Sequence, residues 1–306
     1  HRSVSRGLGD VYKRQILSLL RGKNMKIAQD WLDYEVLATG DGEKLERWGE
    51  FYLLRPDPQV IWHAKSELSK FKDLDGHYLR SSSGGGSWKF YKALPEAWQV
   101  SWKGLKFIIK PMGFKHTGLF PEQAVNWQDL TNVIKKAGRP IKILNLFAYT
   151  GGASVVCAKA GGVVTHVDAS KGMVERAKEN ATLNGITNIR YIVDDCQKFI
   201  EREIRRGNTY DGIIMDPPSY GRGTNGQMWK LEDNLFDFVS LTKKVLSDRP
   251  LFVLISSYTT GLQASVLHNI LTLVFGEGGI DADEIGLPTD EKIVLPCGAR
   301  GLKLWK

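Results

Sequence analysis

The stretch Asp211-Gly-Ile-Ile-Met-Asp216-Pro-Pro-Ser-Tyr220-Gly221 is the most direct indication of how this chain folds. The apolar residues before Asp216 predict a buried parallel strand. Two prolines then end the strand and stiffen the turn that follows. This turn is expected at the carboxyl edge of a sheet, where open α/β folds bind their ligands. A carboxylate and an aromatic ring placed there can accept hydrogen bonds from a planar amino group and stack against it. The residues expected to contact and act on the substrate are therefore Asp216, Pro217 and Tyr220.

From residue 121 onward the sequence alternates between helical and strand patterns. Pro121 is expected to open a helix that ends near Gly138. Such alternation predicts a parallel sheet with helices on both faces. Residues 284–287 and 293–295 flank turn-forming residues and predict a hairpin that gives the sheet a mixed edge. The predicted strands are 141–147, 163–168, 189–193, 212–216 and 251–257, and the helices are about 152–160, 170–184, 195–206, 232–247 and 262–275.

The preceding part of the chain has the short strands and turns of a small β-rich domain. Strands are expected at 34–38 and 51–55, and a hairpin around Lys103-Gly104. We place this domain at residues 25–112 and the α/β domain at 113–306. Tryptophans crowd the small domain, either to fill a small core or to stack on unpaired bases. They are Trp31, Trp48, Trp62, Trp88, Trp98 and Trp102.

Charge and cysteine content limit the remaining possibilities. The 306 residues carry a net charge of +8, but residues 1–24 hold six Lys/Arg and one Asp, which leaves only +3 for the rest. We expect Met25 to be the natural start and residues 1–24 to be a non-native or disordered arm. No apolar run approaches the ~18 residues of a membrane span, so no membrane partner is expected. Three cysteines without metal-site spacing predict no metal site and a reducing, cytoplasmic setting.

A second cluster of motifs predicts a nucleoside cofactor. Residues 144–154 read as a strand, a glycine turn at Gly151-Gly152 and the start of a helix, whose free N–H groups can meet a ligand. Asp168 ends the next strand, 17 residues after Gly151, where a carboxylate binds ribose hydroxyls. Asp195 ends the third strand and could take an adenine amino group. The G-x-G-x-x-G spacing and a basic residue for a pyrophosphate are both missing, which favours a sulfonium nucleoside over a dinucleotide.

These motifs together resemble class I S-adenosylmethionine-dependent methyltransferases, and within them the bacterial branch related to 23S rRNA large-subunit methyltransferases. The matching segments are Phe114-Lys-His-Thr-Gly-Leu-Phe-Pro-Glu-Gln123, Leu144-Asn-Leu-Phe-Ala-Tyr-Thr-Gly-Gly-Ala153, Val167-Asp-Ala-Ser170, Val193-Asp-Asp-Cys196 and Asp216-Pro-Pro-Ser-Tyr-Gly-Arg-Gly223. The resemblance covers about residues 31–303. It implies a Rossmann-like seven-stranded mixed sheet with an antiparallel last strand and helices on both faces.

The resemblance also implies a set of cofactor-binding residues. The turn after the first strand would cradle the methionine part of S-adenosyl-L-methionine, Asp168 and its neighbours would hold the ribose, and Asp195 with Cys196 would line the adenine pocket. Thr117 and Phe120 would cover the cofactor from outside the sheet, and Asp216 would lie close to it. The turn and ribose residues are Phe147, Ala148, Tyr149, Thr150, Gly151, Gly152, Asp168, Ala169 and Ser170.

The expected activity is methylation of a nucleobase nitrogen in RNA, and the resemblance implies ribosomal RNA as the substrate. Methylation at carbon 5 of a pyrimidine needs a cysteine nucleophile, and the strand ends at Asp216 and Ser257 carry none. Cys297 is a remote candidate for that role. Two alternatives stay open: the same transferase acting on a protein or small molecule, and a non-catalytic module that binds the cofactor or RNA.

Overall fold

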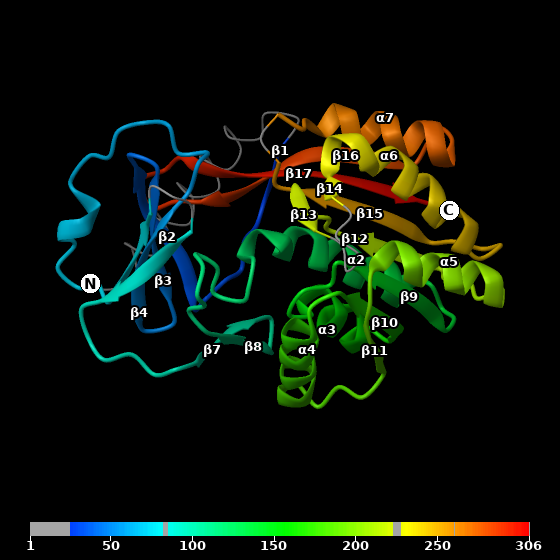
Figure 1. Ribbon diagram of the computed structural model, residues 1–306, viewed down its shortest axis with the longest axis horizontal. Helices are drawn as coiled ribbons and strands as arrows, with labels where there is room; N and C mark the ends of the chain where they lie inside the picture. Colours follow the sequence, from blue (N-terminus) through cyan, green and yellow to red (C-terminus); the bar gives the residue numbers. More distant parts are fainter. Residues whose placement is uncertain (1–24, 82–84, 223–227, 260, 306) are drawn as a thin grey trace, which may run out of the picture.

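The computed structural model describes residues 25–81, 85–222, 228–259 and 261–305, so the expected arm at residues 1–24 lies outside the described residues. An eight-stranded sheet forms the larger part of the molecule (Figure 1). Only β17 runs antiparallel to its neighbours, β15 and β16. In spatial order the strands are β1 (Met25–Ile27), β16 (Ile280–Pro288), β17 (Val294–Leu304), β15 (Phe252–Ser257), β12 (Gly212–Met215), β9 (Ile141–Leu146), β10 (Gly162–Asp168) and β11 (Ile189–Val193).

This sheet confirms the predicted fold class, including the antiparallel last strand. The eighth strand, β1, is an addition that the sequence did not indicate. It pairs in parallel with β16, so residues 25–27 belong to the large sheet although the predicted boundary put them with the small domain. Three residues are too few to display a periodic pattern, which is why this strand escaped prediction.

Helices cover both faces of the large sheet (Figure 1). Alternation along β9 sends Ile143 into the core on one face and Leu144 into the core on the other. The helices on the Ile143 face are α2 (Ala124–Lys136), preceded by the 3₁₀ turn η2 (Pro121–Gln123), α3 (Gly152–Lys159) and α4 (Lys171–Leu183). Those on the Leu144 face are α5 (Cys196–Arg206), α6 (Leu231–Thr242), followed by η3 (Lys243–Val245), and α7 (Ala264–Phe275).

The N-terminal part forms a separate five-stranded sheet with an adjacent hairpin. Its strands, in order, are β2 (Tyr34–Gly40), β3 (Glu43–Trp48), β4 (Phe51–Pro56), β5 (Gly76–Arg80) and β6 (Gly86–Phe90), with η1 (Leu68–Lys70) between β4 and β5. The hairpin consists of β7 (Trp98–Trp102) and β8 (Leu105–Ile109), as predicted. Trp48 and Trp102 are buried, and the other four tryptophans of this region pack half-buried against the same core. Core filling is therefore the role of these rings.

The β16–β17 hairpin joins the two sheets. It is much longer than the predicted 284–287 and 293–295, and its tip reaches the N-terminal sheet. There the Thr39 N–H donates to Glu291 Oε2 at 2.8 Å, and the Asp290 N–H donates to the Val36 carbonyl at 3.0 Å. Residues far apart in the sequence thus hold the small sheet beside the large one.

A buried ion pair lies inside the N-terminal sheet. Glu46 on β3 is fully buried and accepts from Arg55 on β4 in a two-pronged contact, Nε to Oε2 at 2.6 Å and Nη2 to Oε1 at 2.8 Å. The Tyr34 hydroxyl donates to Glu46 Oε1 at 2.8 Å. Charged side chains are tolerated in such a place only when their partners satisfy them.

We predict that Glu46→Ala lowers the free energy of unfolding by about 3–5 kcal/mol, because it leaves the Arg55 guanidinium buried and unpaired. Urea denaturation followed by circular dichroism measures the change. The matched control is Glu35→Ala, which removes a carboxylate that pairs with Arg47 while 40% exposed and should cost about 1 kcal/mol or less. Equal losses from the two variants would contradict the assigned role of the buried pair.

Candidate active site

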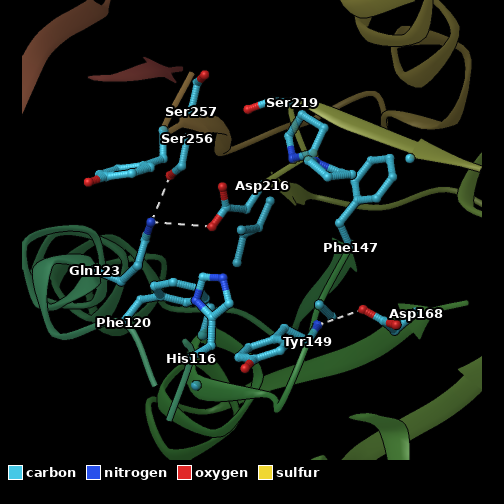
Figure 2. Close-up of a pocket in the computed structure, with 18 of the residues that line it drawn as sticks. His116, Phe120, Gln123, Phe147, Tyr149, Asp168, Asp216, Ser219, Ser256 and Ser257 are labelled. Carbon is cyan, nitrogen blue, oxygen red and sulfur yellow. Dashed lines mark hydrogen bonds between the residues drawn. The ribbon is translucent and has the colours of Figure 1, made fainter. Parts of the chain in front are cut away.

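A cavity of about 800 Å³ opens where the carboxyl ends of the parallel strands meet the N-terminal sheet. Figure 2 shows side chains from β9, β10, β12 and β15 converging on it. Most of the predicted site residues line this cavity. They are Phe120, Phe147, Ala148, Tyr149, Thr150, Gly152, Asp168, Ala169, Ser170, Asp195, Cys196, Asp216 and Pro217.

The turn after β9 has an unusual backbone that Asp168 holds in place. Phe147 and Tyr149 have φ values of 53° and 51°, which residues other than glycine rarely adopt. Asp168 Oδ2 accepts from the Tyr149 N–H at 2.8 Å (Figure 2). Its Oδ1 accepts from the Ser170 N–H at 2.8 Å. One carboxylate thus ties the end of β10 to the turn after β9, which gives the cavity a rigid wall.

Gly151 has a conformational role behind the cavity wall, and it is not among the lining residues. Its φ is 83°, and an added Cβ would lie 2.8 Å from the Cβ of Ala177. The residue lets α4 approach the start of α3 closely. Gly151 thus shapes the turn from behind the cavity wall, and its contact with the cofactor stays a prediction.

The end of β11 supplies a helix cap beside the cavity. Asp195 caps α5, with its Oδ1 accepting from the Lys198 N–H at 3.0 Å. Cys196 is buried, and its sulfur accepts from the Phe147 N–H at 3.3 Å. Burial raises the pKa of this thiol, so Cys196 remains a protonated wall residue with no nucleophilic character.

Two further predicted residues lie away from the cavity. Thr117 is fully buried, and its carbonyl accepts from the Lys110 N–H at 2.9 Å. The next residue, Gly118, contacts the turn after β9, because its carbonyl accepts from the Thr150 hydroxyl at 2.5 Å. Tyr220 is 62% exposed and its hydroxyl lies 3.6 Å from the sulfur of Met228. Strand alternation in β13 (Tyr220–Arg222), which pairs with β14 (Met228–Lys230), turns Gly221 rather than Tyr220 toward the cavity.

Asp216 faces the cavity from the end of β12 without a cationic partner among the described residues. Its described hydrogen-bond partner is Gln123, whose Nε2 lies 3.4 Å from Asp216 Oδ2 (Figure 2). Burial raises the pKa of Asp216 to about 6. A carboxyl group in this state is ionised at neutral pH and can accept hydrogen bonds from a ligand.

Sequence reasoning missed a second carboxyl group in the same cavity, that of Glu122. It is 9% exposed, lines the cavity, and lies close enough to Lys44, Arg55 and Asp216 to interact with them electrostatically. Burial raises its pKa to about 7, opposed by Lys44 and assisted by Asp216. An acidic residue in the first turn of a helix usually interacts with the helix dipole, so nothing in the sequence separated Glu122 from that ordinary role.

The N-terminal sheet and the segment before η2 form the far wall of the cavity. The Tyr258 hydroxyl, just beyond β15, donates to Asp57 Oδ1 at 2.6 Å across the junction. Lys115 lines this wall, and burial together with Lys44 lowers its pKa to about 8. Burial, with Arg55 and Lys115 nearby, lowers the pKa of His116 to about 3, so its ring is neutral. The described residues contain no cluster of three or more His, Cys, Asp or Glu suited to a metal ion.

Comparison with known proteins identifies the family. A family model for S-adenosylmethionine-dependent methyltransferases matches residues 60–232, more than half of the chain. The chain belongs to this family. A crystal structure of an S-adenosylmethionine-dependent methyltransferase from Agrobacterium tumefaciens is 35% identical, with a TM-score of 0.86 over 92% of this chain and 93% of that one.

Two curated relatives share shorter regions with this methyltransferase. The ribosomal RNA large subunit methyltransferase K/L of Pseudoalteromonas translucida is 32% identical over 47% of this chain and 20% of its own length. The ribosomal RNA large subunit methyltransferase I of Aeromonas salmonicida is 32% identical over 38% of this chain and 29% of its own length. The chain thus spans less than a third of either relative.

The cavity fits the cofactor of the family. Acidic side chains, Asp168 and Asp195, stand at two strand ends, and aromatic rings of Phe120, Tyr149 and Phe147 line the space between them and Asp216. The turn at residues 147–152 has no basic side chain that would suit a pyrophosphate. A positively charged sulfonium nucleoside matches this combination of carboxylates and aromatic walls.

We predict that Asp168→Ala weakens S-adenosylmethionine binding by about 10- to 100-fold, since charged hydrogen bonds contribute about 1.5–3 kcal/mol. The variant removes both a ribose acceptor and the two backbone contacts that hold the turn. Calorimetric titration measures the affinity, with Asp233→Ala on the exposed face of α6 as the matched control. Unchanged affinity in a folded Asp168→Ala protein would rule out the ribose contact.

Proposed function

We propose that this methyltransferase methylates a nitrogen atom of a nucleobase in RNA, with ribosomal RNA as the substrate. The observation that carries the proposal is Asp216, a buried carboxylate at the cavity wall with no cationic partner in the described part of the chain. It is followed by two prolines and lies beside the cofactor turn. The names of the two curated relatives support RNA as the substrate class. The other site assignments made from the sequence are part of this proposal.

Asp216 supplies what an amine nucleophile needs. S-adenosylmethionine, when bound, supplies an electrophilic methyl group. Asp216 accepts a hydrogen bond from the target amino group, and this contact orients the nitrogen lone pair toward the methyl group. As the nitrogen is methylated it becomes positively charged, and Asp216 can take up the proton that it loses. Pro217 and Pro218 fix the direction of the chain after Asp216. The aromatic wall excludes water from the reacting groups.

Cys297 gives a second candidate chemistry, because it lines the same cavity. A cysteine in that place would suit the carbon-5 methylation of pyrimidines, which begins with thiolate attack. Burial, with Glu122 nearby, raises the pKa of Cys297 well above its usual value, and its sulfur donates to the Leu295 carbonyl at 3.4 Å. A protonated thiol that is hydrogen-bonded to a backbone carbonyl is a poor nucleophile. This favours nitrogen as the methylated atom.

A cytoplasmic setting is also part of the proposal. All three cysteines are free and buried, as expected in a reducing compartment. Within the described residues, no helix is long and apolar enough to cross a membrane. Transfer to a protein or a small molecule is the alternative, and salt dependence separates it from transfer to RNA, because binding to RNA phosphates weakens steeply as salt rises.

We predict that the protein methylates 23S ribosomal RNA transcribed in vitro, and that Asp216→Ala lowers turnover by about 100-fold or more with cofactor affinity retained. Tritium transfer from labelled S-adenosylmethionine measures the rate. Wild-type turnover should fall as pH drops through about 6, because the pKa of Asp216 is raised and its protonated form is a weaker acceptor that cannot take up a proton from the amine.

Cys297→Ala is the matched control and should retain turnover. The reverse pattern, in which Cys297→Ala is inactive and Asp216→Ala active, would contradict nitrogen methylation. Absence of transfer to RNA, with transfer to a protein extract or metabolite fraction instead, would replace the proposed substrate class.

A further inference from the structure

A fully buried arginine lies behind the active site. Arg300 on β17 is 0% exposed, and its guanidinium bridges α2 and β16. Nη1 donates to Asp129 Oδ2 at 2.7 Å and to Asn126 Oδ1 at 3.1 Å, and Nη2 donates to Asp281 Oδ2 at 2.7 Å. A guanidinium has donors only. The side-chain atom of Asn126 that faces Arg300 is therefore its carbonyl oxygen.

This contact fixes the direction of the Asn126 amide. Asn126 is 1% exposed, and with its oxygen on Arg300 its Nδ2 points to the other side. Nδ2 lies 2.7 Å from Gln123 Oε1 and 3.1 Å from the Ser256 hydroxyl oxygen. The Ser256 hydroxyl also donates to Gln123 Oε1, at 3.4 Å. Two donors thus converge on the oxygen of Gln123.

The direction of the Gln123 amide follows from that of Asn126. Because Oε1 accepts from Asn126 and Ser256, Nε2 is the atom left to face Asp216, 3.4 Å from its Oδ2. Figure 2 shows Gln123 reaching between Ser256 and Asp216. The Arg300 guanidinium can only donate, so it sets the direction of the Asn126 amide, and the Asn126 amide in turn sets the direction of the Gln123 amide.

We propose that Arg300, Asn126 and Gln123 form an amide relay that positions Asp216 for catalysis. The relay makes Gln123 a permanent donor to one oxygen of Asp216, which keeps the carboxylate oriented and leaves its other oxygen to accept a hydrogen from the substrate amine. The substrate part of this inference rests on the proposed function. The three relay members are positioning residues, since they act through Asp216.

The relay opposes the effect of burial on Asp216. An N–H donor stabilises the ionised carboxylate, whereas a carbonyl oxygen in the same place would require a protonated one. A reversed Gln123 amide would therefore raise the pKa of Asp216 and lower the fraction of ionised carboxylate at neutral pH. Other titratable groups around the cavity remain the same whichever way the amide points. Besides Asp216, the titratable residues that line the cavity are Lys44, Arg55, Asp57, Lys115, His116, Glu122, Tyr149, Asp168, Asp195, Cys196, Lys198, Glu201, Tyr258 and Cys297.

A purely structural role for the same contacts makes a different prediction. Arg300 could simply fasten α2 to the β16–β17 hairpin, and Asn126 would then be needed only as an acceptor. Asn126→Asp separates the two roles, because it keeps the volume and the acceptor for Arg300 but removes the donor to Gln123. Gln123 is then expected to turn its Nε2 toward residue 126 and its Oε1 toward Asp216.

The test compares Asn126→Asp with Asn132→Asp, which adds the same charge on the exposed face of α2. Carbon-13 labelling of aspartate carboxyl groups lets NMR follow the titration of Asp216 in the cofactor-free protein, with Asp216→Ala identifying its signal. We expect Asn126→Asp to raise the Asp216 pKa by about one pH unit or more. With the RNA transcript, kcat at pH 7 should follow the ionised fraction of Asp216, falling about 2-fold for a one-unit rise from a pKa of about 6 and about 10-fold for a two-unit rise. KM should stay nearly unchanged, and kcat should partly recover at higher pH.

An Asp216 titration and a kcat that match those of Asn132→Asp would overturn the relay. Because a buried carboxylate at residue 126 also raises the Asp216 pKa by charge repulsion alone, Gln123→Met is measured alongside it. Gln123→Met removes the same donor without adding a charge and should raise the Asp216 pKa in the same direction; an unchanged titration there would overturn the relay. The NMR readout needs no substrate. Failure of the relay is therefore distinguishable from failure of the proposed function, in which the wild-type protein would not methylate RNA at all.

Discussion

The site depends on the burial of the large sheet, which helices cover on both faces. The strands whose carboxyl ends meet at one edge of this sheet are β9, β10, β11, β12 and β15. Strands buried on both faces must be apolar along their length, so polar side chains first become possible where the strands end. Asp168 and Asp216 stand at two of these ends. Asp168 also holds the turn after β9 in its positive-φ conformation, so that binding groups and backbone shape are fixed by the same carboxylate.

The N-terminal sheet completes this edge. The tip of the β16–β17 hairpin is hydrogen-bonded to the N-terminal sheet, and the Tyr258 hydroxyl donates a hydrogen bond to Asp57 across the junction. As a result, the cofactor end of the cavity is built by the family fold, whereas the far wall is built by β3, β4 and the segment around Lys115.

Much of the large domain could be predicted from the sequence, because its strands and helices carry strong periodic patterns between glycine and proline boundaries. The β3 strand could not, since Lys44 and Glu46 make it look like a polar loop. Glu46 is nevertheless fully buried, and the residue that permits this is Arg55 on the next strand. Local sequence does not reveal which charges will find such partners.

The site shows the same limit. Asp168 and Asp216 were predictable because each follows an apolar strand, and residues at strand ends reach a ligand edge. Tyr220 follows the same turn but is exposed at the surface, so its proposed contact with the substrate stays a prediction. The direction of the Gln123 amide depends on Arg300, which is distant in sequence and enters through β17. Contacts of this kind exist only once the sheet has formed.

The acidic, aromatic edge of the sheet is expected to bind a sulfonium nucleoside, and calorimetric titration of the wild-type protein measures this binding without any assumption about the substrate. S-adenosylmethionine is the ligand and NAD, which carries a pyrophosphate, is the comparison. We expect micromolar, one-to-one binding of S-adenosylmethionine and no measurable binding of NAD. A folded protein that binds NAD but not S-adenosylmethionine would contradict this expectation.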